Sequence, residues 1–340
     1  MKKLFVIFAA IALVGAFTAT AMAADWSFYG SSRMKTFYES WSEDYSGTGD
    51  SESTAYWAQQ GNSRIGARVK ASDTISGRFE YGTGVNLRLL YGEWAFSDNG
   101  SLLIGQAYTP MSIFVGSQVW ADDDGLIGIG ADYGLRLDQI KLKIAGFEIA
   151  LIEQPVGGFD NYMPKIEAAY NLALGSVGLQ FIGGYNSYKD LASDETVTSY
   201  VGGIGVTGSF GPAWFNASFH GGQNLANASW YGNAAPDFSI ANAATPGGED
   251  TTSMAFAAAA GMAASEQMSF QLGAGYGQDE NDDYGDKTDK VMSVYLQMKY
   301  AFAPGFAVYP EVGYVDFMKD MADNDEGNIT YFGAKWQIDF

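Results

Sequence analysis

The sequence contains no cysteine and only one histidine, His220. The first absence excludes disulfides, thiol nucleophiles and thiolate metal ligands, and the second excludes a metal site built from several histidines. Beyond residue 23 there is no run of 18 apolar residues, so we expect no membrane-spanning helix. Basic residues are outnumbered, with 19 Lys and Arg against 39 Asp and Glu, and no basic stripe suits nucleic acid as a partner.

The chain begins with the features of an export signal. Met1-Lys2-Lys3 is basic, residues 4–17 are apolar, and Ala21-Met22-Ala23 offers a small-residue cleavage site. We predict that residues 1–23 form a cleaved signal peptide and residues 24–340 a single domain. A membrane anchor is the alternative, although the apolar run is short for a spanning helix. Without Lys2 and Lys3, 17 basic residues face 39 acidic ones, a formal charge of −22.

From Asp25 onward, apolar and polar residues alternate, as expected for strands with one apolar and one polar face. The last eleven residues are typical, because Phe332, Trp336, Ile338 and Phe340 share one parity while Lys335 and Gln337 share the other. The chain is also rich in aromatic residues, which suit membrane interfaces. Because the alternation recurs over almost the whole chain, we predict an all-β fold, a closed antiparallel transmembrane β-barrel. A secreted β-sandwich or β-helix is the alternative.

The predicted connections alternate in length, as in barrels with short periplasmic turns and long outer loops. Fifteen of them can be counted, which predicts about sixteen strands. Residues 133–153 fit least well, because Leu135 and Leu137 carry one apolar parity and Ile140 and Leu142 the other. A β-bulge near Gln139 would reconcile them. A barrel of this size is too wide for side chains to fill, so we expect a water-filled channel for hydrophilic solutes.

Several short segments, in order, resemble the trimeric general porins of Gram-negative outer membranes. Asn62-Ser63-Arg64-Ile65-Gly66 is similar to the family's second strand and residues 88–92 to its fourth. Gly105-Gln106-Ala107-Tyr108-Thr109-Pro110 looks like the approach to the family's third loop, and the terminal Phe340 completes the resemblance. The resemblance implies a porin in the bacterial outer membrane, with a third loop, roughly residues 111–132, folded into the pore.

In that family, acidic residues of the third loop face basic residues on the barrel wall. The resemblance implies an acidic row of Asp122, Asp123, Asp124 and Asp132. It implies a basic row of Arg33, Arg64, Arg68, Arg78, Arg88 and Arg136. The field between two such rows would select passing ions. The alternatives are a solvated acidic turn and arginines away from the constriction. This chain also departs from the family, with Gln106 in place of an arginine.

The acidic surplus lies mainly in the predicted outer loops. Such carboxylates are either simply solvated, or draw cations to the mouth and bind divalent cations that bridge lipid phosphates. We therefore expect a weak cation preference, and no cofactor other than divalent cations at the outer loops.

Three other functions remain open. Ser218 and His220 share one face of a predicted strand and could approach a nucleophile–base pair in a hydrolase. Tyr29, Phe37 and Tyr331 share the inward parity and could line the path of a sugar-specific channel. A structural or adhesive barrel would have a small or plugged lumen.

The resemblance also implies partners: outer-membrane lipid and lipopolysaccharide, two further copies in a homotrimer, periplasmic chaperones and the barrel-assembly machinery. That machinery would read Phe332, Trp336, Ile338 and Phe340 as an assembly signal. Residues 255–264, almost all Ala, Gly and Met, suit close packing between copies, or equally a lipid-facing strand.

Overall fold

The computed structural model describes residues 24–127, 129–153, 159–160, 163–230 and 243–340, so the predicted signal peptide lies outside the described residues. The strands are β1 (Asp25–Trp41), β2 (Glu52–Gln59), β3 (Arg64–Lys70), β4 (Ile75–Gly82), β5 (Leu87–Ser97), β6 (Gly100–Tyr108), β7 (Arg136–Ile144), β8 (Phe147–Ile152), β9 (Phe159–Asp160), β10 (Lys165–Leu174), β11 (Val177–Asp190), β12 (Thr196–Phe210), β13 (Ala213–Gln223), β14 (Thr251–Ala263), β15 (Met268–Asn281), β16 (Thr288–Ala303), β17 (Phe306–Asp316) and β18 (Asn328–Asp339). The helical turns are α2 (Glu43–Ser46), η1 (Ala226–Ala228) and η3 (Asp282–Tyr284). None of the helices within these ranges is long and apolar enough to cross a membrane.

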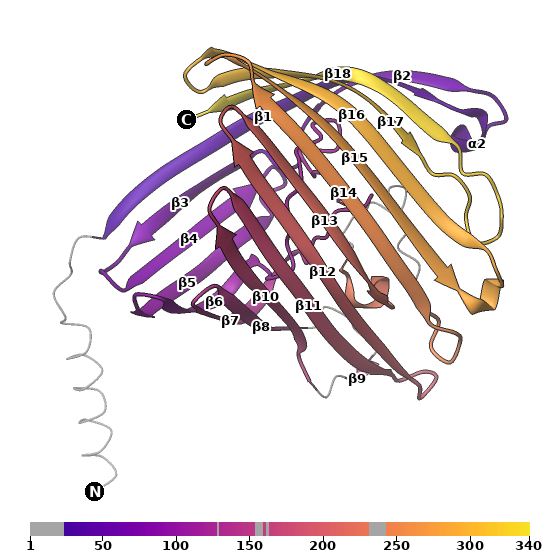
Figure 1. The fold of residues 1–340 in the computed structure, drawn as a ribbon, viewed down its shortest axis with the longest axis horizontal. Helices are drawn as coiled ribbons and strands as arrows, with labels where there is room; N and C mark the ends of the chain where they lie inside the picture. Colours follow the sequence, from indigo (N-terminus) through magenta and orange to yellow (C-terminus); the bar gives the residue numbers. More distant parts are fainter. Residues whose placement is uncertain (1–23, 128, 154–158, 161–162, 231–242) are drawn as a thin grey trace, which may run out of the picture.

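The strands form one closed antiparallel β-barrel. Consecutive strands pair around the ring, and β1 pairs with β18 from Ser31↔Asp339 to Trp41↔Ile329, which closes it (Figure 1). The segments β2 and β3 both pair with β1, and β9 and β10 both pair with β11, so each couple occupies one place in the ring. The ring therefore has sixteen strands, which confirms the predicted fold and strand number.

The connections alternate in length as predicted. One short turn, Ala145-Gly146 between β7 and β8, has positive φ at both residues, 49° and 86°. Two left-handed residues give a tight hairpin the same twist as its strands. The connections at the other end include residues 42–51, 109–135, 191–195 and 317–327.

The apolar parity of the strands faces outward. The outer face of β18 carries Phe332, Trp336 and Ile338, which are 57%, 46% and 54% exposed, followed by Phe340 at 73%. An apolar outer face next to a polar inner one is the arrangement a barrel requires in lipid. The predicted assembly-signal residues thus lie together on the outside of the strand that closes the ring.

The change of apolar parity within residues 133–153 does not involve the β-bulge that we expected near Gln139, which lies in β7. Strands β6 and β7 stay in register from Gly100↔Ile144 to Tyr108↔Arg136. An irregularity lies instead between β4 and β5, where Glu80 pairs with Leu89 and Tyr81 with Leu87, leaving Arg88 as an extra residue. This is the geometry of a β-bulge, which re-aims a side chain. Arg88 lines the barrel interior as a result.

Phe340 joins the two ends of the barrel chain, since its backbone exchanges two hydrogen bonds with Gly30, at 2.7 and 3.1 Å. We expect deletion of Phe340 to reduce assembly into membranes severalfold while leaving the conductance of the assembled barrels unchanged. Folded protein in membrane fractions and single-channel recordings measure the two effects. The control is Phe302→Ala, which removes another outward aromatic side chain, 58% exposed, away from the closure. Normal assembly with altered conductance would contradict the prediction.

Candidate functional site: a charged constriction inside the barrel

Residues 109–135, called the third loop below, fold into the interior of the barrel. The loop is closed at its base by backbone hydrogen bonds from Gly134 to Met111 (2.9 Å) and from Ile113 to Asp132 (3.2 Å). Its apolar side chains, among them Val115 and Leu126, are buried in a cluster with inward residues of the strands. The predicted inward fold of this loop is therefore present.

The wall under the third loop is built of small residues. Ala255, Ala257 and Ala259 on β14 point inward and are at most 4% exposed, because the loop covers them. On β15, a Cβ atom at Gly275 would overlap the carbonyl oxygen of Ile129 in the loop. The run of small residues at 255–264 thus makes room for the loop on its inward side, which neither of our two expectations for it included.

Trp120 anchors the loop to the interior of the barrel. Its indole Nε1 donates a hydrogen bond to Glu39 on β1 (2.6 Å), and its ring stacks on Tyr331 of β18 with centroids 4.5 Å apart. The backbone N–H groups of Val119 and Trp120 donate to the two carboxylate oxygens of Glu311 on β17, at 2.8 and 2.9 Å. Charge-assisted hydrogen bonds of this kind are stronger than neutral ones, so the buried Glu311 fixes the loop backbone.

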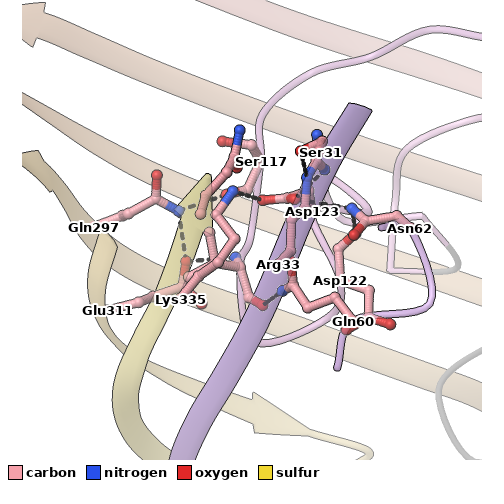
Figure 2. Close-up of polar contacts among 12 residues, drawn as sticks. Ser31, Arg33, Gln60, Asn62, Ser117, Asp122, Asp123, Gln297, Glu311 and Lys335 are labelled. Atoms are coloured by element: carbon pink, nitrogen blue, oxygen red, sulfur yellow. Dashed lines mark hydrogen bonds and ion pairs between the residues drawn. The ribbon is translucent and has the colours of Figure 1, made fainter. Parts of the chain in front are cut away.

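The tip of the loop carries two aspartates that bind the seam between β1 and β18. Asp123 lies between Arg33 and Lys335, at 2.7 and 2.6 Å (Figure 2). Asp122 forms an ion pair with Lys35 at 2.8 Å. Both aspartates have left-handed backbone, with φ of 56° and 63°. Such a backbone costs energy for residues other than glycine, so these contacts have to compensate for it.

The tip also contacts residues 60–63, where β2 gives way to β3. Gln60 donates to the carbonyl of Val119 at 2.6 Å, and the backbone N–H of Gly61 donates to Asp122 at 2.9 Å. Asn62 donates to Asp123 at 2.8 Å and to the backbone carbonyl of Asp122. Because the strand is interrupted between β2 and β3, the side chains of Gln60 and Asn62 and the backbone N–H of Gly61 can bind the loop tip. In a continuous strand, the backbone N–H would be used for pairing with a neighbouring strand.

The opposite wall is basic and is organised around one buried carboxylate. Glu80 on β4, fully buried, lies 2.7 Å from Arg88, 3.0 Å from Arg78 and 3.5 Å from Arg64. Arg136 stands apart, 5.4 Å over the ring of Tyr108. One carboxylate therefore serves three guanidinium groups, and this wall keeps a surplus of positive charge.

The acidic tip and the basic wall face each other across a cavity of about 310 Å³. It is lined by Arg33, Asn62, Arg64, Arg88, Tyr108, Phe114, Asp122, Asp123, Asp124, Ile127, Tyr133, Leu135 and Arg136. Fixed opposite charges on two sides of a water-accessible gap can orient and discriminate ions.

The structure brings together seven of the ten predicted charged residues at this cavity. Asp132 lies away from the cavity, at the base of the loop, and is 1% exposed. Burial and the nearby Glu167 raise its pKa well above the usual range. Arg68 and Arg78 line a different cavity. Gln106 does not line the constriction either, because its amide donates to the backbone carbonyl of Leu87 at 2.8 Å.

Sequence reasoning missed the residues that hold the loop. Lys335, which the sequence places on the polar face of the last strand, is 4% exposed and bound to Asp123. The pairing of β1 with β18 points to such a contact, because it places Lys35 and Lys335 directly opposite each other. Like charges directly opposite each other destabilise a sheet, so this pair requires carboxylates from elsewhere. Glu80, Glu39 and Glu311 carried no such signal.

Asp124 has the most pH-sensitive position at the cavity. Its surface is open to the cavity, yet it lies deep within the barrel, and desolvation together with Asp122 and Asp123 raises its pKa to about 7. A carboxyl with a raised pKa is neutral below that value and charged above it.

We therefore expect the permeability of cations relative to anions through the barrel to increase as the pH rises through about 7, when Asp124 becomes negatively charged. The permeability ratio of K⁺ to Cl⁻ at about pH 5 and about pH 9 measures this. Asp124→Asn should abolish most of the change, whereas Asp194→Asn, an exposed loop carboxylate paired with Lys189, should not. An unchanged pH response in Asp124→Asn would refute the assignment.

The residues proposed for a hydrolase and for a sugar-specific channel do not have the geometry that these functions require. Ser218 and His220 lie on the inward side of β13 and are 2% and 1% exposed, and the Ser218 hydroxyl has no hydrogen-bond partner within the described residues. The nucleophile–base hydrogen bond of a hydrolase is thus not formed. Phe37 and Tyr331 are buried against each other at 5.8 Å and do not continue an open aromatic path from Tyr29. Within the described residues, no group of three His, Cys, Asp or Glu side chains could hold a metal ion.

Comparison with solved structures finds the same fold in several outer-membrane proteins. DcaP, an outer membrane channel of Acinetobacter baumannii, is 16% identical over 93% of this chain and 97% of its own, with a TM-score of 0.68. OmpT, an outer membrane protein of Vibrio cholerae solved in a trimer form, is 16% identical over 94% and 100%, with a TM-score of 0.62. An anion-selective porin from Comamonas acidovorans is 12% identical over 93% and 100%, with a TM-score of 0.61. No family model and no curated protein matches this sequence.

Proposed function

This chain has the fold of the Gram-negative porins, and on that premise we propose that it forms a water-filled channel in the outer membrane. Small hydrophilic solutes and ions would diffuse through it passively. The observation that carries the proposal is the third loop, which is fixed inside a sixteen-stranded ring and leaves a charged cavity between its tip and the wall. A barrel of this width holds water unless it is plugged, and the loop narrows it.

The constriction in this proposal has Asp122, Asp123 and Asp124 with their partner Arg33 on one side and Arg64, Arg88 and Arg136 on the other, all at one cavity. Their charges nearly balance, particularly since Glu80 neutralises part of the basic wall. The acidic outer loops add to the negative side of this balance, because they concentrate cations at the mouth. We therefore propose a weak cation preference.

The proposal is tested by recording purified, refolded protein in planar bilayers. We expect discrete conductance steps and, across a salt gradient, a reversal potential that favours cations. That preference should weaken at high ionic strength, because salt screens the loop charges. A reversal potential favouring anions would contradict the selectivity, and the absence of conductance would contradict the channel itself.

Self-association and assembly complete the proposal. A trimer is supported by the likeness to a structure solved in a trimer form. Export through the inner membrane by a signal peptide, contact with lipopolysaccharide, chaperones and the assembly machinery, and divalent cations at the outer loops are proposed on the resemblance described above.

A further inference from the structure

A second cavity, of about 500 Å³, lies on the inner wall at the end of the barrel where β3 turns into β4. Its basic groups are Arg68, Arg78 and Lys70, and Tyr91, the direct cross-strand partner of Arg78, adds an aromatic ring. This volume is within the range of cavities that hold small molecules. The cavity does not include the third loop and is separate from the constriction.

The two arginines of this cavity are held together against electrostatic repulsion. Arg68 and Arg78 are direct partners across the β3–β4 ladder. Both guanidinium groups lie 5.2 Å from the centre of the Tyr29 ring, and the Nε of Arg78 donates to the Tyr29 hydroxyl at 2.8 Å. Stacking on an aromatic ring fixes the plane of a guanidinium group and leaves its edge for a planar anion.

The positive charge of this pair is not balanced by its surroundings. Arg78 shares Glu80 with two other arginines, and Arg68 forms no ion pair within the described part of the chain. Arg68 is nevertheless exposed inside the barrel, and available to solutes.

Two of the three carboxylates that line the same cavity, Asp73 and Glu93, have basic partners of their own, and the third is Asp25. Asp73 binds Lys70 at 2.9 Å, and Asp25 is opposite Lys70 across the ladder. Glu93 binds Lys143 at 3.0 Å and accepts from Ser101 at 2.6 Å. Asp73 and Glu93 thus do not neutralise the arginines, and none of the three carboxylates forms an ion pair with Arg68 or Arg78 within the described residues.

We propose that Arg68 and Arg78 form a binding site for small organic carboxylates with an apolar or aromatic body, which would pause there on their way through the channel. The guanidinium pair would bind the carboxylate through charge-assisted hydrogen bonds, and the ring of Tyr91, on the same face as Arg78, would contact the apolar body. This inference rests on the proposed channel function only for the route by which the solute arrives.

The site is tested by calorimetric titration of the purified protein with benzoate, with benzamide as a neutral molecule of the same shape. We expect benzoate to bind, benzamide to bind at least about tenfold more weakly, and Arg68→Ala to weaken benzoate by about tenfold or more. The matched control is Lys299→Ala, which removes another basic group stacked on a tyrosine, 5.7 Å over Tyr309. Arg68→Ala also removes a pair of like charges, so it should not impair folding.

Failure of the site and failure of the channel give different results. Equal binding of benzoate and benzamide, or an equal loss in Lys299→Ala, would overturn the carboxylate site while conductance in KCl remained. Benzoate binding that depends on Arg68 in a protein without conductance would sustain the site and refute the channel. The Arg68→Lys variant should recover only part of the affinity, because an ammonium group cannot bind a carboxylate with a planar fork.

Discussion

Replacing Gly275 by valine is expected to lower the single-channel conductance at least roughly twofold, because the third loop would be pushed off the wall and into the gap that it already narrows. A Cβ atom at this position would overlap the carbonyl oxygen of Ile129 and approach the Cβ of Leu126 to 3.4 Å. The first obstacle is backbone, which cannot rotate away as a side chain can. The loop must therefore move inward from β15, where overpacking would typically cost about 1–3 kcal/mol.

The control for this prediction is Gly202→Val on β12. A Cβ atom there meets nothing within 4 Å, so valine should leave the conductance unchanged. Single-channel recordings of the two variants in the same salt provide the comparison. If Gly275→Val assembles and conducts like the parent protein, the third loop does not set the narrowest section of the channel.

Replacing Asp123 by alanine should have the largest effect on stability and on selectivity. The change leaves Arg33 and Lys335, with side chains 14% and 5% exposed, without their shared carboxylate. Removing one member of a buried charge pair typically costs about 3–5 kcal/mol. The cavity also loses a negative charge, so ion selectivity should shift toward anions. Denaturant unfolding in detergent and reversal potentials measure the two effects.

Asp73→Ala is the matched control, because Asp73 also binds a lysine but its side chain is 94% exposed. An exposed pair contributes roughly 0–1 kcal/mol, so the stability of this variant should change little. Equal destabilisation of the two variants would show that the burial of the Asp123 contacts is not what stabilises the loop.

The fold was predictable because each strand exposes one face to an apolar environment. The period-2 pattern that places Phe332, Trp336 and Ile338 outside requires only neighbouring residues in the sequence. The same pattern places Arg33, Arg64 and Lys335 inside. The pattern fails at Arg88. This residue of β5 has no partner on β4, and the resulting bulge changes the direction of its side chain without any sign in the local sequence.

The contacts of the constriction were less predictable because they are not local. Asp123 and Lys335 are separated by 212 positions, and Val119 and Glu311 by 192. Alternation tells which residues point inward, but not which of them the third loop reaches. Asp132 illustrates the limit, since it belongs to the same acidic loop as Asp122 and yet lies buried at the base of that loop, away from the cavity.

The bridge from Asp123 to Arg33 and Lys335 joins the first strand, the last strand and the third loop at a single carboxylate. Lys335 is one of the two basic partners of Asp123, and it reaches its place beside Arg33 only when β18 pairs with β1. We therefore expect the constriction to form late in folding, because its contacts have very high sequence separation. In a barrel that has not yet closed, the third loop would lack its contact with Lys335. The barrel would then reach its final permeability only when assembly is complete.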